Sequence, residues 1–527
     1  MPEDEQTAEA RFAAALALHR QGQLAAAADA YSEALKLEPG LIGARINRGA
    51  CLRSLGRTAE ALAELRDTAR RAPTVGVVHL SLSQVLSDLG STADALAEAE
   101  LAAALDPANA AAQLNLGQRL ADAGRIEAAI PPITRSTSLA PQMIEAWSEL
   151  ANALTRADRL EEALVASERA LKLSPDHADA LSTYGNIERE LGRFEDAFAT
   201  HLRALALKPA SPEIAWNFAL AALTAGHYGS GWIHFDRRLE CRGALVRSYA
   251  QDRWDGRAPL DRKTVFVYPE LGFGDTIHFV RFAPILKQRG ARRLIVEVQA
   301  PLVPLIARMP GIDQVIGPKE TPPPFDFHLP LISLLPALDI RPETVLPAEG
   351  YLTAPAKERP EIAAALRRPP HDALTVGLVW SGDMSRSFGA KRSVPVLDLL
   401  EAVNIPGVAP FLLQKERSAG DAEVIRMHKS AIDLAPWLGD FDDTAWAVSQ
   451  LDLVISVDTA VAHLAGALGI PVWLLLRYAR DWRYPVTHEE SPWYESMRLV
   501  PQTRRGDWSD ALGEVREALA ALAAEGG

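Results

Sequence analysis

The sequence predicts an α-solenoid followed by two α/β domains. The first half of the chain repeats with a period of 34 residues, and the second half alternates short β-branched runs with helical segments. A composition of 48% hydrophobic and 23% charged residues over 527 positions is that of a soluble globular protein. We expect the solenoid over residues 8–243, a junction over 244–262, and the two α/β domains over 263–370 and 371–527.

Charge and cysteine usage exclude several classes of function. A formal net charge of −13 lacks the cationic excess of a nucleic-acid binder. Cys51 and Cys241 lie far apart without a metal-type spacing, which predicts no metal site and favours a reducing compartment. The acidic N-terminus does not resemble a signal peptide, and no apolar run is long enough for a membrane span. We therefore expect a cytoplasmic protein without a transmembrane segment.

Each repeat has a turn, a close helix crossing and a stop at fixed positions. Glycine permits the tight turn, a small alanine five residues later lets two helices cross closely, and proline ends the second helix. The turn residues are Gly22, Gly56, Gly90, Gly124, Asp158, Gly192 and Gly226; the alanines are Ala27, Ala61, Ala95, Ala129, Ala163 and Ala197; the prolines are Pro39, Pro73, Pro107, Pro141, Pro175 and Pro209.

These positions resemble the tetratricopeptide repeat, as do Trp147, Leu150 and Gly185 in first helices. The resemblance covers roughly residues 8–243 and implies seven units, the last degenerate because Gly231 stands at the alanine position. It also implies a superhelix whose concave groove binds an extended peptide or another protein.

Polar residues recur on the first helix of the units in two series offset by three residues, which places them on one helix face. Such a ladder could hold the backbone of an extended chain. Alternatively, these residues solvate the groove and tie neighbouring repeats together, and both interpretations stay open. The first series is Asn47, Ser81, Asn115, Glu149, Thr183 and Asn217, and the second is Gln84, Gln118, Asn152 and Asn186. The five asparagines of these series are the candidate groove residues.

The second half is expected to form parallel sheets covered on both faces, because strands and helices alternate there. The expected strands are "TVFVY", "RLIVEV", "TVGLVW", "APFLLQ", "LDLVISV" and "PVWLLL". Proline-rich breaks at 317–330 and 367–373 separate two such domains, and the second break is the expected hinge. Since ligands bind at the carboxyl ends of parallel strands, motifs directly after strands carry the functional prediction.

The first such motif is "ELGFGDTIHF", in which Gly272 and Gly274 precede Asp275. The third glycine of a dinucleotide-binding G-x-G-x-x-G is replaced by Ile277. Asp275 could point into the cleft between the domains, or it could only cap the helix. His278 could be catalytic or could line the same groove.

Two further motifs follow strands of the second domain. The loop after Trp380 carries Arg386, Lys391 and Arg392, which either neutralise a diphosphate or form a solvated surface loop. After a strand at Leu451–Val457, a helix begins with Asp458 and Thr459 and continues to His463, so that free N–H groups, a hydroxyl and an imidazole could face one anion. As isolated features, the Asp-Thr start would be only a cap and the histidine only a packing residue. No motif demands a metal or a cofactor.

Together, "GFGDTIHFVRFAPIL" and "ISVDTAVAHLAGALGIPV" resemble the two-domain GT-B glycosyltransferases, most closely the ADP-heptose heptosyltransferase-like superfamily, over roughly residues 263–522. The resemblance implies a GT-B fold of two Rossmann-like domains with Asp275 as general base. We place His278 beside it as a second catalytic residue. Ala460 replaces the glycine of the family's D-T-G-x-x-H segment. The resemblance and the motifs together assign the donor nucleotide and phosphate to Gly272, Gly274, Arg386, Lys391, Arg392, Asp458, Thr459 and His463.

The fusion of repeats to such a transferase looks like the architecture of protein O-GlcNAc transferases and of bacterial flagellin glycosyltransferases, in which the repeats present a protein acceptor. This resemblance implies metal-independent transfer of a sugar from a nucleotide diphosphate sugar to a Ser or Thr hydroxyl of a protein in the repeat groove. Two alternatives stay open: a lipid-linked or polysaccharide acceptor, and a non-catalytic scaffold for protein–protein interaction.

Overall fold

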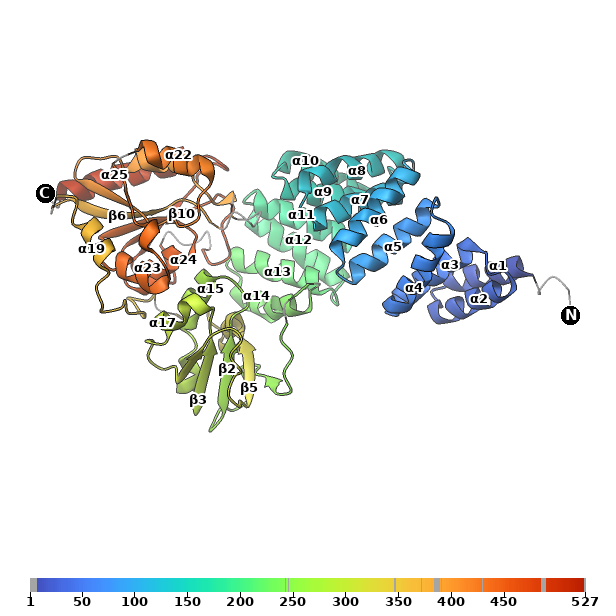
Figure 1. Cartoon of the computed structure of the whole chain (residues 1–527), viewed down its shortest axis with the longest axis horizontal. Coiled ribbons are helices and arrows are strands. Elements are labelled where there is room, and N and C mark those ends of the chain that lie inside the picture. The colour runs from blue at the N-terminus through green and yellow to red at the C-terminus, as the bar shows by residue number, and fades with distance from the viewer. Residues whose placement is uncertain are drawn as a thin grey trace. The chain divides into compact units, whose positions relative to one another are not determined.

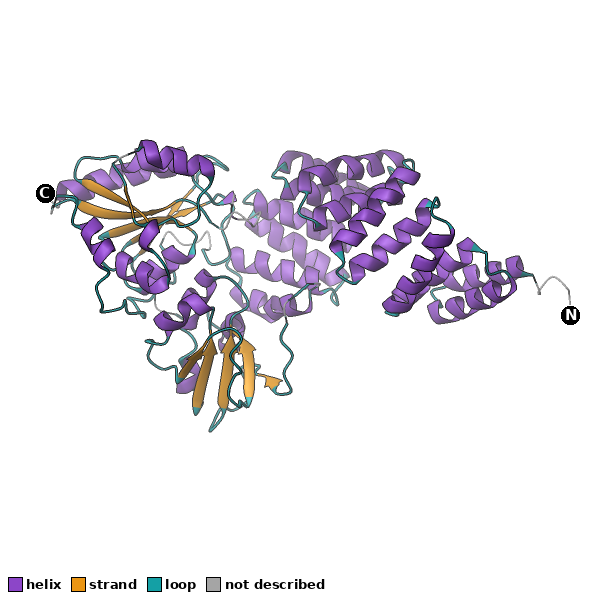
Figure 2. Cartoon of the chain, in the orientation of Figure 1, coloured by secondary structure: helices purple, strands orange, loops and turns teal. Residues whose placement is uncertain are grey.

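The computed structural model describes residues 7–241, 243–244, 246–345, 347–370, 372–382, 389, 391–428, 430–484 and 490–525. The chain divides into two compact units, Met1–Ile187 and Glu188–Gly527. Helices account for the first unit, whereas the strands lie in the second, as Figure 2 shows for the described residues.

Fourteen α-helices of the described chain form seven successive pairs, as the 34-residue period predicts. Within the first unit each pair packs on the next: α2 on α3, α4 on α5, α6 on α7 and α8 on α9 (Figure 1). The pairs are α1 (Ala8–Arg20) and α2 (Leu24–Leu37); α3 (Ile42–Ser54) and α4 (Thr58–Arg71); α5 (Gly76–Asp88) and α6 (Thr92–Leu105); α7 (Ala110–Asp122) and α8 (Ile126–Leu139); α9 (Ile144–Arg156) and α10 (Leu160–Leu173); α11 (Ala178–Glu190) and α12 (Phe194–Leu207); α13 (Pro212–Thr224) and α14 (Tyr228–Phe235).

The repeat positions have the roles that the sequence predicts. The turn glycines adopt left-handed backbone conformations, and Asp158 adopts the same conformation with φ of +66°. The six alanines at the helix crossings are fully buried. At Gly231, which replaces the seventh alanine, a Cβ atom would lie 2.7 Å from the Leu223 side chain, so only glycine fits there without a shift.

The first parallel sheet has the strand order β1-β5-β2-β3-β4. Its first strand, β1, lies within the predicted junction and pairs with β5. The strands are β1 (Asp252–Arg253), β2 (Thr264–Tyr268), β3 (Arg293–Glu297), β4 (Gln314–Ile316) and β5 (Phe327–Pro330). The helices of this part are α15 (Phe273–Val280), α16 (Ile285–Gln288), α17 (Val303–Ile306), α18 (Leu334–Leu338), α19 (Pro360–Leu366) and the 3₁₀ turns η2 (Asp236–Glu240), η3 (Ala300–Leu302) and η4 (Leu331–Ser333).

One face of this sheet departs from the expected alternation of strand and helix. Residues 317–326, between β4 and β5, form no helix. This connection contains three consecutive prolines, at positions 322–324, which lack the N–H groups that a helix needs. Side chains from loops cover the face instead: Tyr249 and Phe325 pack against Phe266 and Tyr268.

The second sheet is parallel throughout, in the order β11-β10-β9-β6-β7-β8. Counted from β6, this is the strand order 3-2-1-4-5-6 of doubly wound sheets, in which the order reverses beside the first strand. The strands are β6 (Leu374–Val379), β7 (Val408–Leu412), β8 (Ile432–Asp433), β9 (Leu453–Val457), β10 (Val472–Leu476) and β11 (Met497–Pro501); the helices are α21 (Val396–Val403), α22 (Ala419–Met427), α23 (Phe441–Val448), α24 (Ala460–Ala467) and α25 (Ser509–Glu525), with the 3₁₀ turn η5 (Ala435–Trp437).

Apolar side chains cover both faces of the second sheet. Val376, Leu378 and Ile455 join a core with residues of α21 and α25. Val454 and Leu474 join another core, to which α15 and α24 also contribute, so this core is continuous from one sheet to the other. The two sheets therefore share packing within residues 188–527.

Candidate active site between the two parallel sheets

The starts of two helices meet where the sheets approach each other. Helix α15 follows β2 of the first sheet, α24 follows β9 of the second, and the two helices pack together (Figure 1). A Cβ atom at Gly274 would lie 3.0 Å from His463 Cδ2 and 3.3 Å from Ala460 Cα. Gly274 therefore allows the start of α15 to lie directly against the start of α24. In this arrangement, Gly274 covers the helix terminus that the sequence assigns to a phosphate.

Asp275 both caps its helix and forms an ion pair across the site. The N–H of Gly272 donates to Asp275 Oδ2 at 3.1 Å. Asp275 Oδ1 accepts a hydrogen bond from Arg483 Nη2, which lies in the loop after β10. The carboxylate thus caps α15 and also pairs with a side chain from the loop after β10.

Arg483 is the main cation of the site and was not among the predicted residues. Its Nη1 donates to Asp481 Oδ1 at 2.7 Å. Burial alone would lower the pKa of Arg483, but the nearby carboxylates of Asp481, Asp275 and Asp458 outweigh burial and raise it. The guanidinium is therefore charged at every physiological pH.

Asp458 brings together the predicted residues of the second sheet. Its Oδ1 accepts from the Tyr484 hydroxyl at 3.4 Å and lies 3.4 Å from His463 Nε2, while Oδ2 lies 3.6 Å from Arg392 Nη1. Burial would raise the pKa of Asp458, but His463, Arg483 and Arg392 outweigh burial and lower it. Asp458 is therefore an ionised carboxylate that holds two predicted donor-site residues in place.

The two predicted histidines stack on each other, with ring centroids 4.8 Å apart. His463 Nδ1 lies 3.1 Å from the Tyr494 hydroxyl. His278 is fully buried, and neither of its ring nitrogens has a hydrogen-bond partner among the described residues. Burial lowers the pKa of His278 well below its usual value, so the ring is neutral. Its ring also lies against those of Phe279, Trp493 and Tyr494.

The other residues predicted to contact phosphate do not all lie at this site. Thr459 precedes α24, and its hydroxyl lies 3.0 Å from the hydroxyl of Ser456. Lys391 Nζ lies 4.0 Å from a carboxylate oxygen of Glu190, in α11. Arg386 lies outside the described residues.

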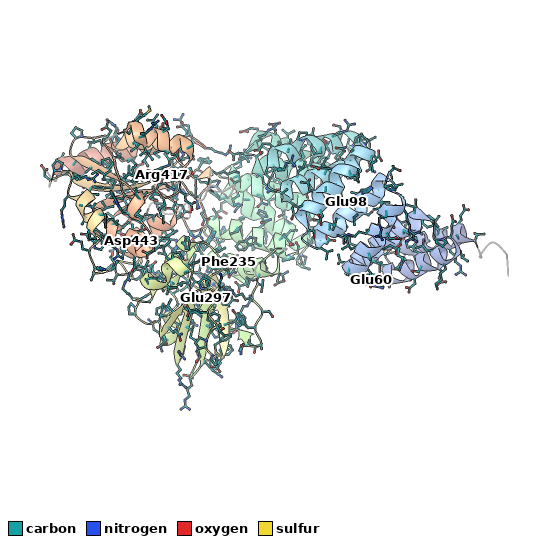
Figure 3. The ribbon with its side chains drawn as sticks, in the orientation of Figure 1. Glu60, Glu98, Phe235, Glu297, Arg417 and Asp443 are labelled. Atoms are coloured by element: carbon teal, nitrogen blue, oxygen red, sulfur yellow. The ribbon has the colours of Figure 1, made fainter. Side chains whose placement is uncertain are left out.

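Aromatic residues of the seventh helix pair hold the loop that carries Arg483. The ring of Trp482 packs edge-on against Phe235 of α14, with centroids 5.6 Å apart, and against Trp232 at 5.8 Å (Phe235 is labelled in Figure 3). Trp482 also stacks on Phe279 of α15 at 6.0 Å. Trp232 and the segment "DWRY" (Asp481–Tyr484) stand out in the sequence, but no spacing rule connects them.

The candidate groove residues do not share one environment. Asn115 is buried, and its amide donates to Ser83 Oγ at 2.8 Å, which ties α7 to α5. Asn152 is exposed, while Asn47, Asn186 and Asn217 are half-buried. Two of the neighbouring amides connect successive repeats: Gln84 accepts from Arg53, and Gln118 donates to Glu149. At these positions the polar residues link repeats, as the second interpretation predicts.

A cavity of about 570 Å³ lies elsewhere in the first unit, between α6, α7 and α8. Its lining includes Leu116, Leu120, Arg125 and Pro131, and none of the candidate groove asparagines. Among the described residues, no three His, Cys, Asp or Glu side chains are placed to hold a metal ion. Within the same part of the chain, no helix combines the length and apolarity that crossing a membrane requires.

Known proteins match the first part of the chain. Family models of the tetratricopeptide repeat match residues 3–42, 80–144 and 142–210. From residue 7 on, these ranges contain the paired helices and left-handed turns described above. The first part of the chain is an array of tetratricopeptide repeats.

A curated relative extends over more of the chain. Protein FlbA of Caulobacter vibrioides is 26% identical over 333 residues, which is 58% of this chain and 54% of FlbA. The chain therefore spans about half the length of this relative.

Solved structures match between a third and two fifths of the chain. The Cut9–Hcn1 hetero-tetramer of APC/C is 16% identical with a TM-score of 0.39, covering 42% of this chain and 44% of that one. PilW, a type IV pilus biogenesis factor, is 24% identical with a TM-score of 0.36, covering 40% and 97%. The repeat protein TTC0263 of Thermus thermophilus is 19% identical with a TM-score of 0.31, covering 34% and 99%.

Proposed function

We propose that the chain is a cytoplasmic glycosyltransferase of the GT-B type that moves a sugar from a nucleotide diphosphate sugar to a hydroxyl of a protein bound by its repeats. One observation carries this proposal: α15 and α24, which follow the carboxyl ends of β2 and β9, pack against each other at their N-terminal ends. In doubly wound sheets, ligands bind at that edge, beside the point where the strand order reverses. Charged groups from both sheets converge there.

The second sheet would hold the donor. Arg392 and the N-terminus of α24 are suited to a diphosphate, because a helix N-terminus carries free N–H groups and a partial positive charge. The Thr459 hydroxyl lies at the same helix start. These groups would stabilise the leaving diphosphate without a metal ion.

Asp275 would act as the base. The acceptor oxygen attacks the anomeric carbon while the bond from that carbon to the diphosphate oxygen breaks; the diphosphate leaves with the bonding electrons, and the hydroxyl proton passes to Asp275. A positioned base contributes roughly 10²–10⁴ in rate. Leu271 and Phe273, both about two fifths exposed (43% and 40%), flank this segment and offer an apolar surface to the acceptor.

Titration of the full chain with UDP, GDP, CDP, ADP and TDP in a calorimeter tests the donor half of the proposal. We expect one of these to bind and the corresponding nucleotide sugar to be consumed when acceptor protein is present. Replacement of Thr459 by Val removes the hydroxyl at nearly constant volume and should weaken that binding. Asp398→Asn, on the exposed side of α21, removes a charge elsewhere in the same part and serves as control.

A specific observation also favours a non-catalytic scaffold. In this structure the chain's own groups occupy the site, since Arg483 holds Asp275 and Gly274 covers the start of α24. A scaffold would keep these contacts permanently and bind none of the five nucleoside diphosphates. A transferase acting on a lipid-linked or polysaccharide hydroxyl would bind a nucleotide but leave the proteins of the host unmodified.

A further inference from the structure

Arg483 lies among more carboxylates than it can neutralise. Three carboxylates act on it, those of Asp275, Asp458 and Asp481, while Arg392 and His463 also pair with Asp458 among the described residues. A diphosphate that enters this cluster brings negative charge beside three carboxylates, so it can pair with Arg483 only where one of those carboxylates gives up that cation.

Asp275 is the carboxylate that can give up Arg483. Asp481 is two residues from Arg483 and also accepts the Arg483 backbone N–H at 3.1 Å, so the two belong to one turn. Asp458 is held by Tyr484 and Arg392. Asp275 comes from α15, more than two hundred positions earlier, and keeps the Gly272 N–H as a partner if Arg483 leaves.

The guanidinium groups of Arg483 and Arg392 each have a donor without an acceptor among the described residues. The Nε atoms of Arg483 and Arg392 are both buried, and neither meets an acceptor among the described residues. Buried donors in folded proteins are nearly always paired. Both guanidiniums lie near Asp458, so an anion with several oxygens arriving there would supply the acceptors that the chain does not.

We propose that Arg483 binds the donor diphosphate and that Asp275 holds it in the ligand-free chain, so that donor binding releases Asp275 to act as the base. The inference rests on the proposed function and adds the order in which donor and acceptor are used. Until the diphosphate takes Arg483, one oxygen of Asp275 is occupied by a guanidinium and the other by a backbone N–H. The donor must therefore bind before the acceptor hydroxyl can be deprotonated.

The test is calorimetric titration of the full chain with the nucleoside diphosphate that the wild type binds best, or with all five if it binds none. Asp275→Asn removes the competing charge, and we expect binding about tenfold tighter than wild type. Arg483→Gln should weaken binding by about tenfold or more, and Arg483→Lys, which keeps the charge but not the fork of donors, should fall between. A misfolded variant cannot produce the gain expected of Asp275→Asn.

The double variant Asp275→Asn/Arg483→Gln distinguishes release of Arg483 from a general effect of removing a negative charge. We expect it to bind no more tightly than Arg483→Gln alone, because the gain requires the released guanidinium. Unchanged or weaker binding by Asp275→Asn, or an equal gain in the double variant, would overturn the inference while leaving donor binding intact. Absence of binding by both the wild type and Asp275→Asn would instead overturn the proposed function, and this inference with it.

Discussion

Glu190, at the end of α11, accepts two hydrogen bonds from Arg477, in the loop after β10, at 2.9 and 3.1 Å. Both side chains are largely buried. A repeat helix and the loop after β10 thus share one buried ion pair. Two residues after Glu190, a Cβ atom at Gly192 would lie 2.7 Å from the Tyr478 ring. The sixth repeat therefore anchors the loop from which Trp482 and Arg483 reach the site.

The Glu190–Arg477 ion pair makes the free energy of unfolding depend on pH. Burial would raise the pKa of Glu190, but Arg477, Arg189 and Lys391 outweigh burial and lower it to about 2, from 4.5. The stabilisation is complete above pH 4.5 and is lost as the pH falls towards 2; in full it is roughly 3 kcal/mol. Urea unfolding at pH 6 and pH 3 should show that Glu190→Gln costs more at pH 6. An equal cost at both values would contradict the assigned ion pair.

His201 should destabilise the chain in mild acid. It is fully buried in α12 without a partner for either ring nitrogen among the described residues, and burial, with a smaller contribution from Arg189, lowers its pKa to about 3. The unfolded chain takes up a proton below about pH 6.5 that the folded chain refuses, so stability falls as the pH drops. Between pH 7 and 5, His201→Gln should lose about 2 kcal/mol less stability than wild type. Parallel curves for the two proteins would show that the ring is protonated when folded.

Asp158→Gly should stabilise the repeats. Asp158 adopts a left-handed conformation, with φ of +66°, that glycine adopts without strain. The expected gain is about 0.5–1 kcal/mol, measured as the shift in the urea midpoint. Gly90→Asp is the reverse change at a turn with φ of +76° and open space for a side chain, and it should lose a similar amount. A gain in both variants would exclude backbone strain as the cause.

Gly274→Ala should separate the starts of α15 and α24. The added methyl would lie 3.0 Å from His463 and 3.3 Å from the Ala460 backbone, which is closer than packed atoms tolerate. Overpacking of this kind costs about 1–3 kcal/mol. Gly272→Ala is the matched control, because its methyl would meet only Asp275 Oδ2 at 3.6 Å. Equal thermal stability of the two variants would contradict the close approach of these helices.

Local patterns predicted much of this arrangement. The period of the turn glycines predicted seven helix pairs, and the strand before Asp458 predicted that His463 and Asp458 would share one helix start. The contact of Asp275 with Arg483 was beyond reach, because it joins segments separated by 208 positions and no spacing rule connects them. The same applies to Trp482, whose partners Phe235 and Phe279 lie in other elements.

The prolines between β4 and β5 predicted a break in the pattern of strands and helices. They did not predict that this connection would lie over one face of the first sheet. Extended segments carry no periodicity that marks the surface they cover. The groove asparagines differ in burial for a related reason: a common helix face sets the direction of their side chains, but burial depends on the neighbouring repeat. Their role in holding an acceptor stays a prediction. Asn115 therefore meets Ser83, while Asn152 faces solvent.

The most direct test of sugar transfer is intact-protein mass spectrometry of the host proteome, with the wild-type gene compared with the Asp275→Asn allele. The variant keeps the fold and the donor site but lacks the base. We predict that at least one host protein carries the mass of a sugar only when the wild-type gene is present. Identical protein masses with both alleles would contradict transfer of a sugar to protein.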